Sequence, residues 1–456
     1  MSEHNSSLQR GLKNRHIQLI AMGGAIGTGL FLGAGHIIPQ AGPSIILGYA
    51  IGGLIAFLIM RHLGEMIVEE PVAGSFSHFA YKYWGKFAGF LTGWNYWVLY
   101  ILVAMSELTA VGKYVNYWWP DVPVWASVFF FFLIVSAINL LNVKFYGEAE
   151  FWLSIIKVVA VISMIVFGAY LLLTADIGST ATITNLWAQG GFFPHGFDGL
   201  FYMLAFIMFA FGGIELIGMT AAEADNPQKN IPKAINQVVW RILIFYVLAL
   251  AILLSLVPWN QLQFGSADNL DKSPFVMIFS QMGIHWAAHL LNFIILTAAL
   301  SVYNSGMYAN SRMLFSLAEQ GNAPKMFAKT NKQGTPINAS LFSSLLIFSC
   351  VVLNFFFEDT LKHLVYIIVG ILVLNWAMIS ITHIRFKQQM IKLGKTTSFP
   401  ALFYPVTNYI VLAFVAVIFF VMAKQGFEYA VILLPIWTIA MFGIYKVLKP
   451  SSPSLK

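Results

Sequence analysis

The sequence predicts an all-α membrane protein with twelve transmembrane helices. Of its 456 residues, 59% are hydrophobic and only 10% are charged, whereas a soluble domain carries about 25% charged residues. Apolar stretches of about 20 residues, the length that crosses a bilayer core about 30 Å thick, recur along the chain. They lack the alternation of apolar and polar residues that is typical of strands in a transmembrane β-barrel.

These apolar stretches predict one transmembrane domain over 16–450, between tails at 1–15 and 451–456, because no long linker divides the chain. The first 15 residues are polar, so we expect no cleavable signal peptide. The predicted spans are 17–39, 43–64, 87–115, 124–142, 151–174, 197–221, 238–258, 286–317, 338–357, 362–383, 401–423 and 428–447.

The distribution of basic residues predicts that both termini are cytoplasmic. With the N-terminus inside, 21 of the 26 Lys and Arg residues fall in inner segments and four in outer segments, while Lys157 lies within the fifth span. An excess of Lys and Arg in the inner segments is what orients membrane proteins. The net charge of +7 therefore indicates topology, and we expect no nucleic-acid partner.

The residue content disfavours several classes of site. Cys350 is the only cysteine, so no intramolecular disulfide can form. The ten histidines form no metal-ligand pair within a span, and the sequence has neither a Ser/His/Asp set nor a GxxxxGK[ST] phosphate loop. We expect no enzyme, no metal and no cofactor. A channel is disfavoured because a pore needs rings of like residues, usually from repeated subunits.

Glycines interrupt the first and the sixth spans near mid-membrane. Residues 23–33 read GGAIGTGLFLG and residues 209–213 read FAFGG. Each glycine inside a helix costs about 1 kcal/mol relative to alanine, so the clusters indicate broken helices, with close helix packing as the alternative. Broken helices at corresponding positions of two inverted repeats indicate the binding site of a transporter.

The two breaks lie five helices apart, on helices that run in opposite directions. This arrangement predicts a five-plus-five inverted repeat, with repeat one at about 16–175 and repeat two at about 197–384. Two extra helices follow at about 401–448, outside the repeat.

The broken helices present complementary partial charges. The second half of helix 1 begins at about Thr28, and its free N–H groups suit a carboxylate. The preceding half ends near Ala25, and the first half of helix 6 ends near residues 209–212, so free carbonyls at both places suit an ammonium group. A ligand that carries both charges a few ångströms apart is an α-amino acid.

Several motifs resemble those of the amino acid–polyamine–organocation transporter superfamily, over about residues 10–448. They include GLKNRHIQLIAMGGAIGTGLF, EAEFWLSIIKV and EADNPQKNIPKAI. Within it, HFAYKYWG, GWNYWVLY and FPALFYP most resemble the bacterial general aromatic amino acid permeases. The resemblance implies import of Phe, Tyr and Trp across the inner membrane by proton symport, with no obligate protein partner. A permease for another neutral amino acid and an exchanger of the same fold are the alternatives.

The resemblance also implies the residues that bind the substrate. The G-S/T-G break holds the carboxylate, backbone carbonyls hold the amine, and helices 3 and 8 line the side-chain pocket. Phe209 acts in addition as a gate over the bound substrate. The matching positions are Ala25, Gly27, Thr28, Gly29, Tyr100, Ala104, Phe209, Gly212 and, to within about a turn, Gly306.

Ionisable residues within the predicted spans are functional candidates because a charge in the bilayer is costly. Lys157 lies mid-way along helix 5, at the place that a sodium ion fills in sodium-coupled relatives, and is expected to carry the transported proton; a permanently charged lysine that bridges carbonyls is the alternative. Glu215 and Glu107 are further proton-coupling candidates, or they satisfy buried polar groups. Glu65 and Arg61 are expected to form a closure network at the cytoplasmic gate, or an ordinary solvated ion pair.

Overall fold

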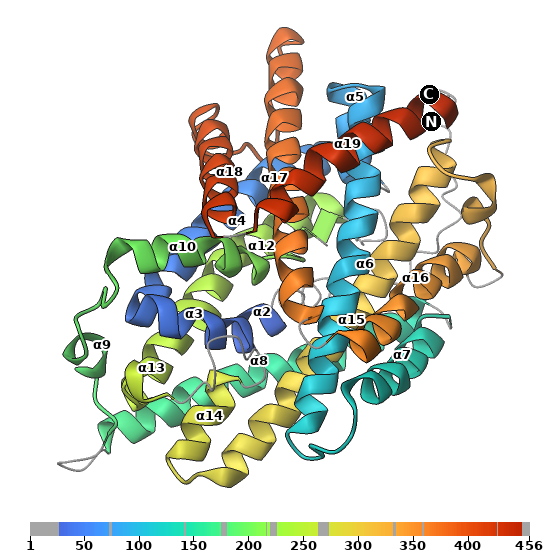
Figure 1. The fold of residues 1–456 in the computed structure, drawn as a ribbon. Coiled ribbons are helices and arrows are strands. Elements are labelled where there is room, and N and C mark those ends of the chain that lie inside the picture. Colours follow the sequence, from blue (N-terminus) through green and yellow to red (C-terminus); the bar gives the residue numbers. More distant parts are fainter. Residues whose placement is uncertain are drawn as a thin grey trace.

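The computed structural model describes residues 27–72, 75–140, 143–174, 180–215, 217–218, 226–262, 273–331, 334–357, 360–425 and 427–448. Every long regular element within these residues is a helix (Figure 1). The predicted all-α fold is therefore confirmed. The α-helices are α2 (Thr28–Phe31), α3 (Gly33–Ala41), α4 (Ile45–Glu69), α5 (Ser75–Tyr83), α6 (Lys86–Asn116), α7 (Val124–Leu140), α8 (Val143–Leu173), α9 (Asn185–Ala188), α10 (Gly196–Phe209), α12 (Pro227–Ile242), α13 (Ala249–Leu256), α14 (Pro274–Gln281), α15 (His285–Glu319), α16 (Ile337–Phe356), α17 (Thr360–Lys392), α18 (Val406–Lys424) and α19 (Glu428–Leu448).

Each of the twelve predicted spans overlaps a helix in the described part of the chain. Nine helical stretches there are long and apolar enough to cross a membrane, and one of them, Thr28–Glu69, contains the described part of the first span and the whole second span. Spans four and six correspond to the shorter apolar helices α7 and α10. The seventh span begins earlier than predicted, at Pro227, and contains a π-helical turn at Leu243–Leu248 between α12 and α13.

Helices α6 and α15 pack against each other at the centre of the molecule (Figure 1). They are helices 3 and 8 of the predicted numbering, which would be corresponding members of the two repeats. Helix α15 also contacts α7, α8 and α16, and α17 contacts α4, α6 and α10. The central pair is almost entirely buried, so the candidate residues on it lie away from the outer surface.

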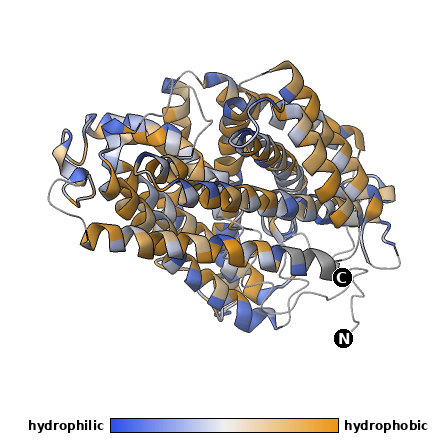
Figure 2. Cartoon of the chain, turned by 90° about the horizontal axis from the view of Figure 1, so that it is seen from below, coloured by the Kyte–Doolittle hydropathy of each residue, from blue (hydrophilic) through white to orange (hydrophobic). Residues whose placement is uncertain are grey.

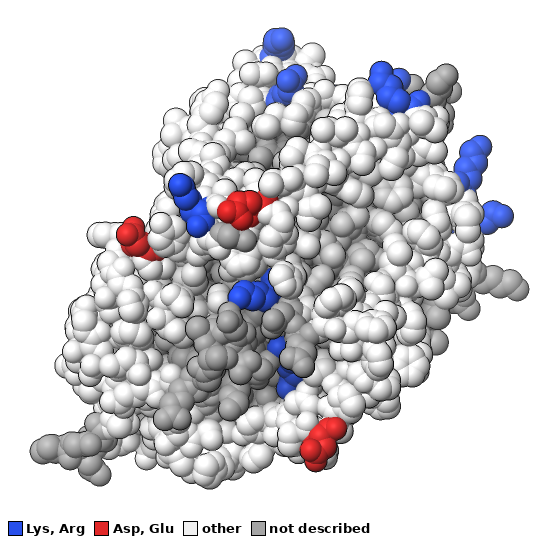
Figure 3. Space-filling view, viewed as in Figure 1, with Lys and Arg blue, Asp and Glu red and all other residues white. Residues whose placement is uncertain are grey.

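The outer surface of the bundle is apolar. Trp152 and Val166 on α8 are 61% and 63% exposed, and Ile439 on α19 is 71% exposed. Apolar residues run along the shafts of the helices in Figure 2, and few charged side chains interrupt the face in Figure 3. A water-soluble protein rarely exposes so large an apolar area; here it would face lipid.

The short helix α5 is tied to the end of α4 by Glu70. Lys82 Nζ donates to Glu70 Oε2 at 2.6 Å, and His78 Nε2 lies 3.0 Å from Glu70 Oε1. Burial alone would raise the pKa of the Glu70 carboxyl, but the hydrogen bonds and charges of His78 and Lys82 outweigh burial and lower that pKa to about 2. This contact orders the loop between the second and third spans.

Candidate functional site

Helix α2 begins at Thr28, where the second half of helix 1 is predicted to begin, and the first half lies outside the described residues. Gly27 has an extended backbone (φ −137°, ψ −158°), and its carbonyl accepts hydrogen bonds from the N–H groups of Leu30 and Phe31 at 3.3 and 3.4 Å. The first N–H groups of a helix have no acceptor inside it, so those of Thr28 and Gly29 need one from elsewhere. Ala25 lies outside the described residues.

Helix 6 breaks where the second glycine cluster predicted. Helix α10 ends at Phe209, and the chain continues in tight turns, in which the Gly212 N–H donates to the Phe209 carbonyl at 3.2 Å. This bond uses one of the two lone pairs that were expected to face the substrate amine. Gly213 then adopts a φ of +96°, a conformation that favours glycine. Glu215 is fully buried in this turn, and neither of its carboxylate oxygens has a hydrogen-bond partner among the described residues.

The two breaks touch each other through their backbones. A Cβ atom added to Gly29 would lie 2.5 Å from the Cα and 2.8 Å from the N of Ala210. The glycine thus allows the start of α2 to lie directly against the end of α10. The predicted substrate contacts on helices 1 and 6 are therefore brought together.

Two buried tyrosines support the broken backbones in matching ways. Tyr49 on α4 donates to the Gly29 carbonyl at 3.0 Å, and Tyr246 in the π-helical turn donates to the Ala210 carbonyl at 3.0 Å. Their rings stack, with centroids 5.4 Å apart. Tyr49 lies on helix 2 and Tyr246 on helix 7, which would be equivalent in the predicted repeat. Each hydroxyl thus donates to the helix that precedes its own. Neither tyrosine stands out in the sequence, because each lies among other apolar residues of its span.

Glu107 on α6 binds the break in helix 1. The Thr28 hydroxyl, which was expected to contact the substrate carboxylate, donates to Glu107 Oε1 at 2.8 Å. A Cβ atom on Gly27 would lie 3.1 Å from the same oxygen. Both groups are buried. Glu107 thus satisfies a buried hydroxyl, which was one of the two expectations. The Thr28 hydroxyl must break this hydrogen bond before it can donate to a substrate carboxylate.

The residues predicted to line the side-chain pocket lie together on the central pair. A Cβ atom on Gly306 of α15 would contact the Tyr100 carbonyl oxygen at 3.6 Å and Ala104 Cβ at 3.7 Å. These are ordinary packing distances, so the site has room for one more methyl group and for little else in this arrangement. Tyr100 itself is 2% exposed.

Lys157 is fully buried on α8 and its Nζ donates to the Ser301 hydroxyl of α15 at 2.8 Å. That hydroxyl in turn donates to the carboxylate of Glu150. Glu150 is a functional candidate that was not predicted. Its spacing of seven residues from Lys157 could have indicated it, because residues seven apart lie two turns apart on the same face of a helix. It was not considered because it lies just before the fifth predicted span, which begins at residue 151.

Glu65 lies in a buried hydrogen-bond network, but its partners are not those predicted. The solvated ion pair with Arg61 is wrong, since Glu65 is fully buried and the network of described residues around it does not include Arg61. The donors to the Glu65 carboxylate are His383 Nε2 at 2.9 Å, the Ala401 N–H at 2.7 Å, and the side chains of Lys387 and Thr397.

Arg61 binds the same connection between α17 and α18. Its guanidinium donates to the Pro400 carbonyl and, at 3.3 Å, to Asn236 Oδ1, and it lies 3.8 Å from the centre of the Phe399 ring. Arg61 and Glu65 therefore bind the segment 397–401 rather than each other.

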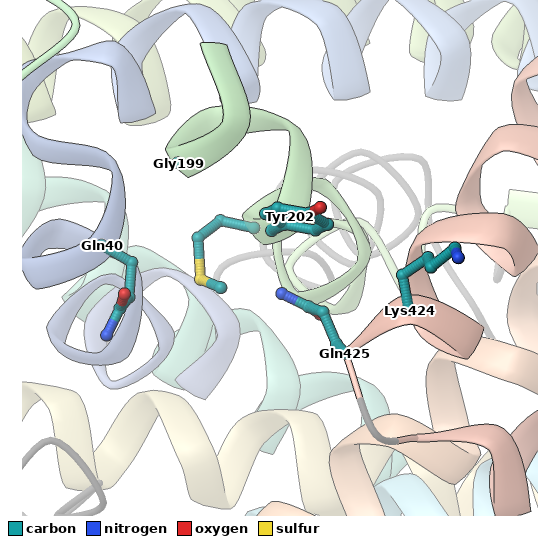
Figure 4. Close-up of a pocket in the computed structure, with 6 residues that line it drawn as sticks. Gln40, Gly199, Tyr202, Lys424 and Gln425 are labelled. Atoms are coloured by element: carbon teal, nitrogen blue, oxygen red, sulfur yellow. The ribbon is translucent and has the colours of Figure 1, made fainter. Parts of the chain in front are cut away.

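A surface cavity of about 210 Å³ lies at the ends of α3, α10 and α18, and it contains none of the predicted site residues (Figure 4). Tyr202 from α10 faces Gln425 and Lys424 across it, and Met203 also lines it. The described residues of the candidate site, among them Gly29 and Gly306, are instead in packing contact with their neighbours.

Comparisons with known proteins identify the family. A model described as "Amino acid permease" matches residues 16–449. The chain belongs to the amino acid permease family. The permease is 58% identical over 441 residues to the aromatic amino acid transport protein AroP of Escherichia coli (strain K12), which covers 96% of this chain and 95% of the relative.

Two further relatives are similar over nearly the whole chain. AroP of Salmonella typhimurium (strain SL1344) is 58% identical over 96% of the permease. The uncharacterized transporter YdgF of Bacillus subtilis (strain 168) is 43% identical over 450 residues, or 98% of the permease and 97% of the relative. The predicted superfamily is confirmed, and the permease is a multi-pass membrane transporter of amino acids, not an enzyme.

Proposed function

We propose that this permease imports aromatic L-amino acids by proton symport across the bacterial inner membrane, with both termini in the cytoplasm. The main support for an aromatic substrate is the 58% identity, over 96% of the chain, to proteins named as aromatic amino acid transport proteins. Tyr100, which lies beside Gly306 on the central pair, supports it, because an aromatic substrate can stack on an aromatic ring.

The substrate lies between the two breaks in this proposal. Its carboxylate takes the N–H groups at the start of α2, and its amine takes carbonyls at the end of α10. Helices 1, 2, 6 and 7 move against helices 3, 4, 8 and 9 to expose the site to each side in turn. The contact of Thr28 with Glu107 belongs to the closed, substrate-free arrangement.

The coupling ion is a proton, carried by Lys157, and no other cofactor takes part. A buried amine within hydrocarbon can lose its proton because the charged form is the costly one. Among the described residues Lys157 donates to a neutral hydroxyl at 2.8 Å, which holds the charged form less strongly than a direct carboxylate partner would.

Uptake into proteoliposomes tests the proposal. Labelled phenylalanine should accumulate above equilibrium under an acid-outside pH gradient, and Tyr and Trp should compete while Leu, Pro and Arg should not. Lys157→Gln should abolish this accumulation. Uptake that needs internal amino acid would indicate an exchanger, and competition by Leu instead of Tyr would overturn the substrate assignment.

A further inference from the structure

A second buried ionisable residue lies next to Lys157. Glu150 is fully buried on the same helix, two turns closer to its N-terminal end. The Ser301 hydroxyl joins the two residues, since it accepts from Lys157 at 2.8 Å and donates to Glu150 Oε1. Lysine, hydroxyl and carboxylate therefore form one continuous hydrogen-bonded chain.

Polar side chains from three helices surround the Glu150 carboxylate. Ser154 donates to Oε1 at 3.2 Å and Asn304 to Oε2 at 3.5 Å, while Asn139 of α7 donates to Asn304 at 2.8 Å. These groups are neutral.

The charges that act on Lys157 come from three helices. Glu150 lies on its own helix, Glu107 on α6 and Arg241 on α12. Of these residues, Glu150 is the one that the described hydrogen bonds connect to Lys157.

We propose that Glu150 receives the transported proton from Lys157 through the Ser301 hydroxyl and passes it to the cytoplasm. The proposal rests on the proton symport proposed above. In the transfer, the ammonium N–H bond of Lys157 breaks and its proton binds Ser301 Oγ. The original Ser301 hydroxyl proton moves at the same time to Glu150 Oε1. The products are a neutral amine, an unchanged hydroxyl and a carboxylic acid, and the acid later gives its proton to water at the inner face.

Two physical arguments favour this route. An ion pair and its neutral counterpart, an amine with a carboxylic acid, have the same net charge, so the transfer moves no net charge into the bilayer, where a lone charge is costly. Seven residues of helix also place the Cα atom of Glu150 about 10 Å from that of Lys157 along the axis of α8. In the predicted topology, Glu150 is the residue nearer to the cytoplasm.

Glu150→Gln tests the relay in proteoliposomes that contain the full-length protein. Accumulation of labelled phenylalanine under an acid-outside gradient should fall at least tenfold. Exchange of external for internal phenylalanine, which requires no net release of a proton, should stay within about threefold of the unaltered protein. Glu148→Gln is the matched control, because it neutralises a carboxylate on the same helix half a turn away, and it should keep accumulation.

The hydroxyl provides an independent test if Glu150→Gln fails to fold. Ser301→Ala should lose accumulation, and Ser301→Thr, which keeps the hydroxyl, should restore it. Full accumulation by Glu150→Gln, or equal loss of accumulation and exchange in a folded variant, would overturn the relay. If the unaltered protein itself shows no gradient-driven accumulation, the symport proposal is wrong; if it accumulates and Glu150→Gln does too, only the relay is wrong.

Discussion

Replacing Gly29 with alanine would place a methyl group between the two broken helices. The added Cβ atom would lie 2.5 Å from Ala210 Cα and 2.8 Å from Ala210 N, whereas ordinary contact begins at 3.4 Å. The helices must therefore separate by about 0.9 Å, since both clashing atoms belong to the backbone and no rotamer change can relieve them. Overpacking of this kind costs about 1–3 kcal/mol.

Gly33→Ala, four residues later at the start of α3, is the matched control. Its Cβ atom would lie 3.3 Å from a ring carbon of Phe206, and a side chain can give way by a tenth of an ångström. The thermal unfolding midpoint in detergent and phenylalanine uptake would be measured for both variants. Gly29→Ala should lower the midpoint by several degrees and reduce uptake at least tenfold, while Gly33→Ala should match the unaltered protein. Equal behaviour of the two variants would refute the close approach of the breaks.

Three other predictions follow from hydrogen bonds and packing. Tyr49→Phe and Tyr246→Phe each leave a buried carbonyl at a break without its donor, so each should cost about 1–3 kcal/mol and lower the unfolding midpoint; unchanged midpoints would contradict this role. The Glu70 carboxyl has a pKa below its unfolded value, so its stabilisation is complete above about pH 4.5 and disappears as the pH falls toward 2. Because it is partly exposed, the gain is only about 1 kcal/mol, and the unfolding midpoints of Glu70→Gln and the unaltered protein should converge in acid. Tyr100→Phe should change the relative uptake of Phe, Tyr and Trp in competition assays, and an unchanged ratio would remove Tyr100 from the pocket.

Local patterns in the sequence were sufficient to locate the helices and the two breaks. Apolar length determines a span, and glycine clusters determine where a helix cannot continue, so Thr28 and Phe209 were found at the correct helix ends. Lys157 was found because a charge within an apolar stretch is conspicuous.

The partners of these residues could not be predicted in the same way. Ser301 meets Lys157, and His383 meets Glu65, across helices that are far apart in the sequence. Arg61 and Glu65 are one turn apart and read as a pair, but the folded chain offers each of them better partners in the segment 397–401. The sequence pattern indicates which buried polar residue needs a hydrogen-bond partner, but the packing of distant helices determines which partner it has.

The hydrogen bonds to Glu65 affect how far the chain can be truncated from its C-terminus. The two C-terminal helices lie outside the predicted repeat, so a truncation after α17 would appear to leave a complete ten-helix carrier. Yet Thr397 and Ala401 supply two of the four donors to the buried Glu65 carboxylate, and Asn408 donates to the Ser380 carbonyl at 3.1 Å. Such a truncation would remove two of the four donors to this buried carboxylate and leave His383 and Lys387. The segment that joins α17 to α18 and the start of α18 therefore contribute to the stability of the second helix.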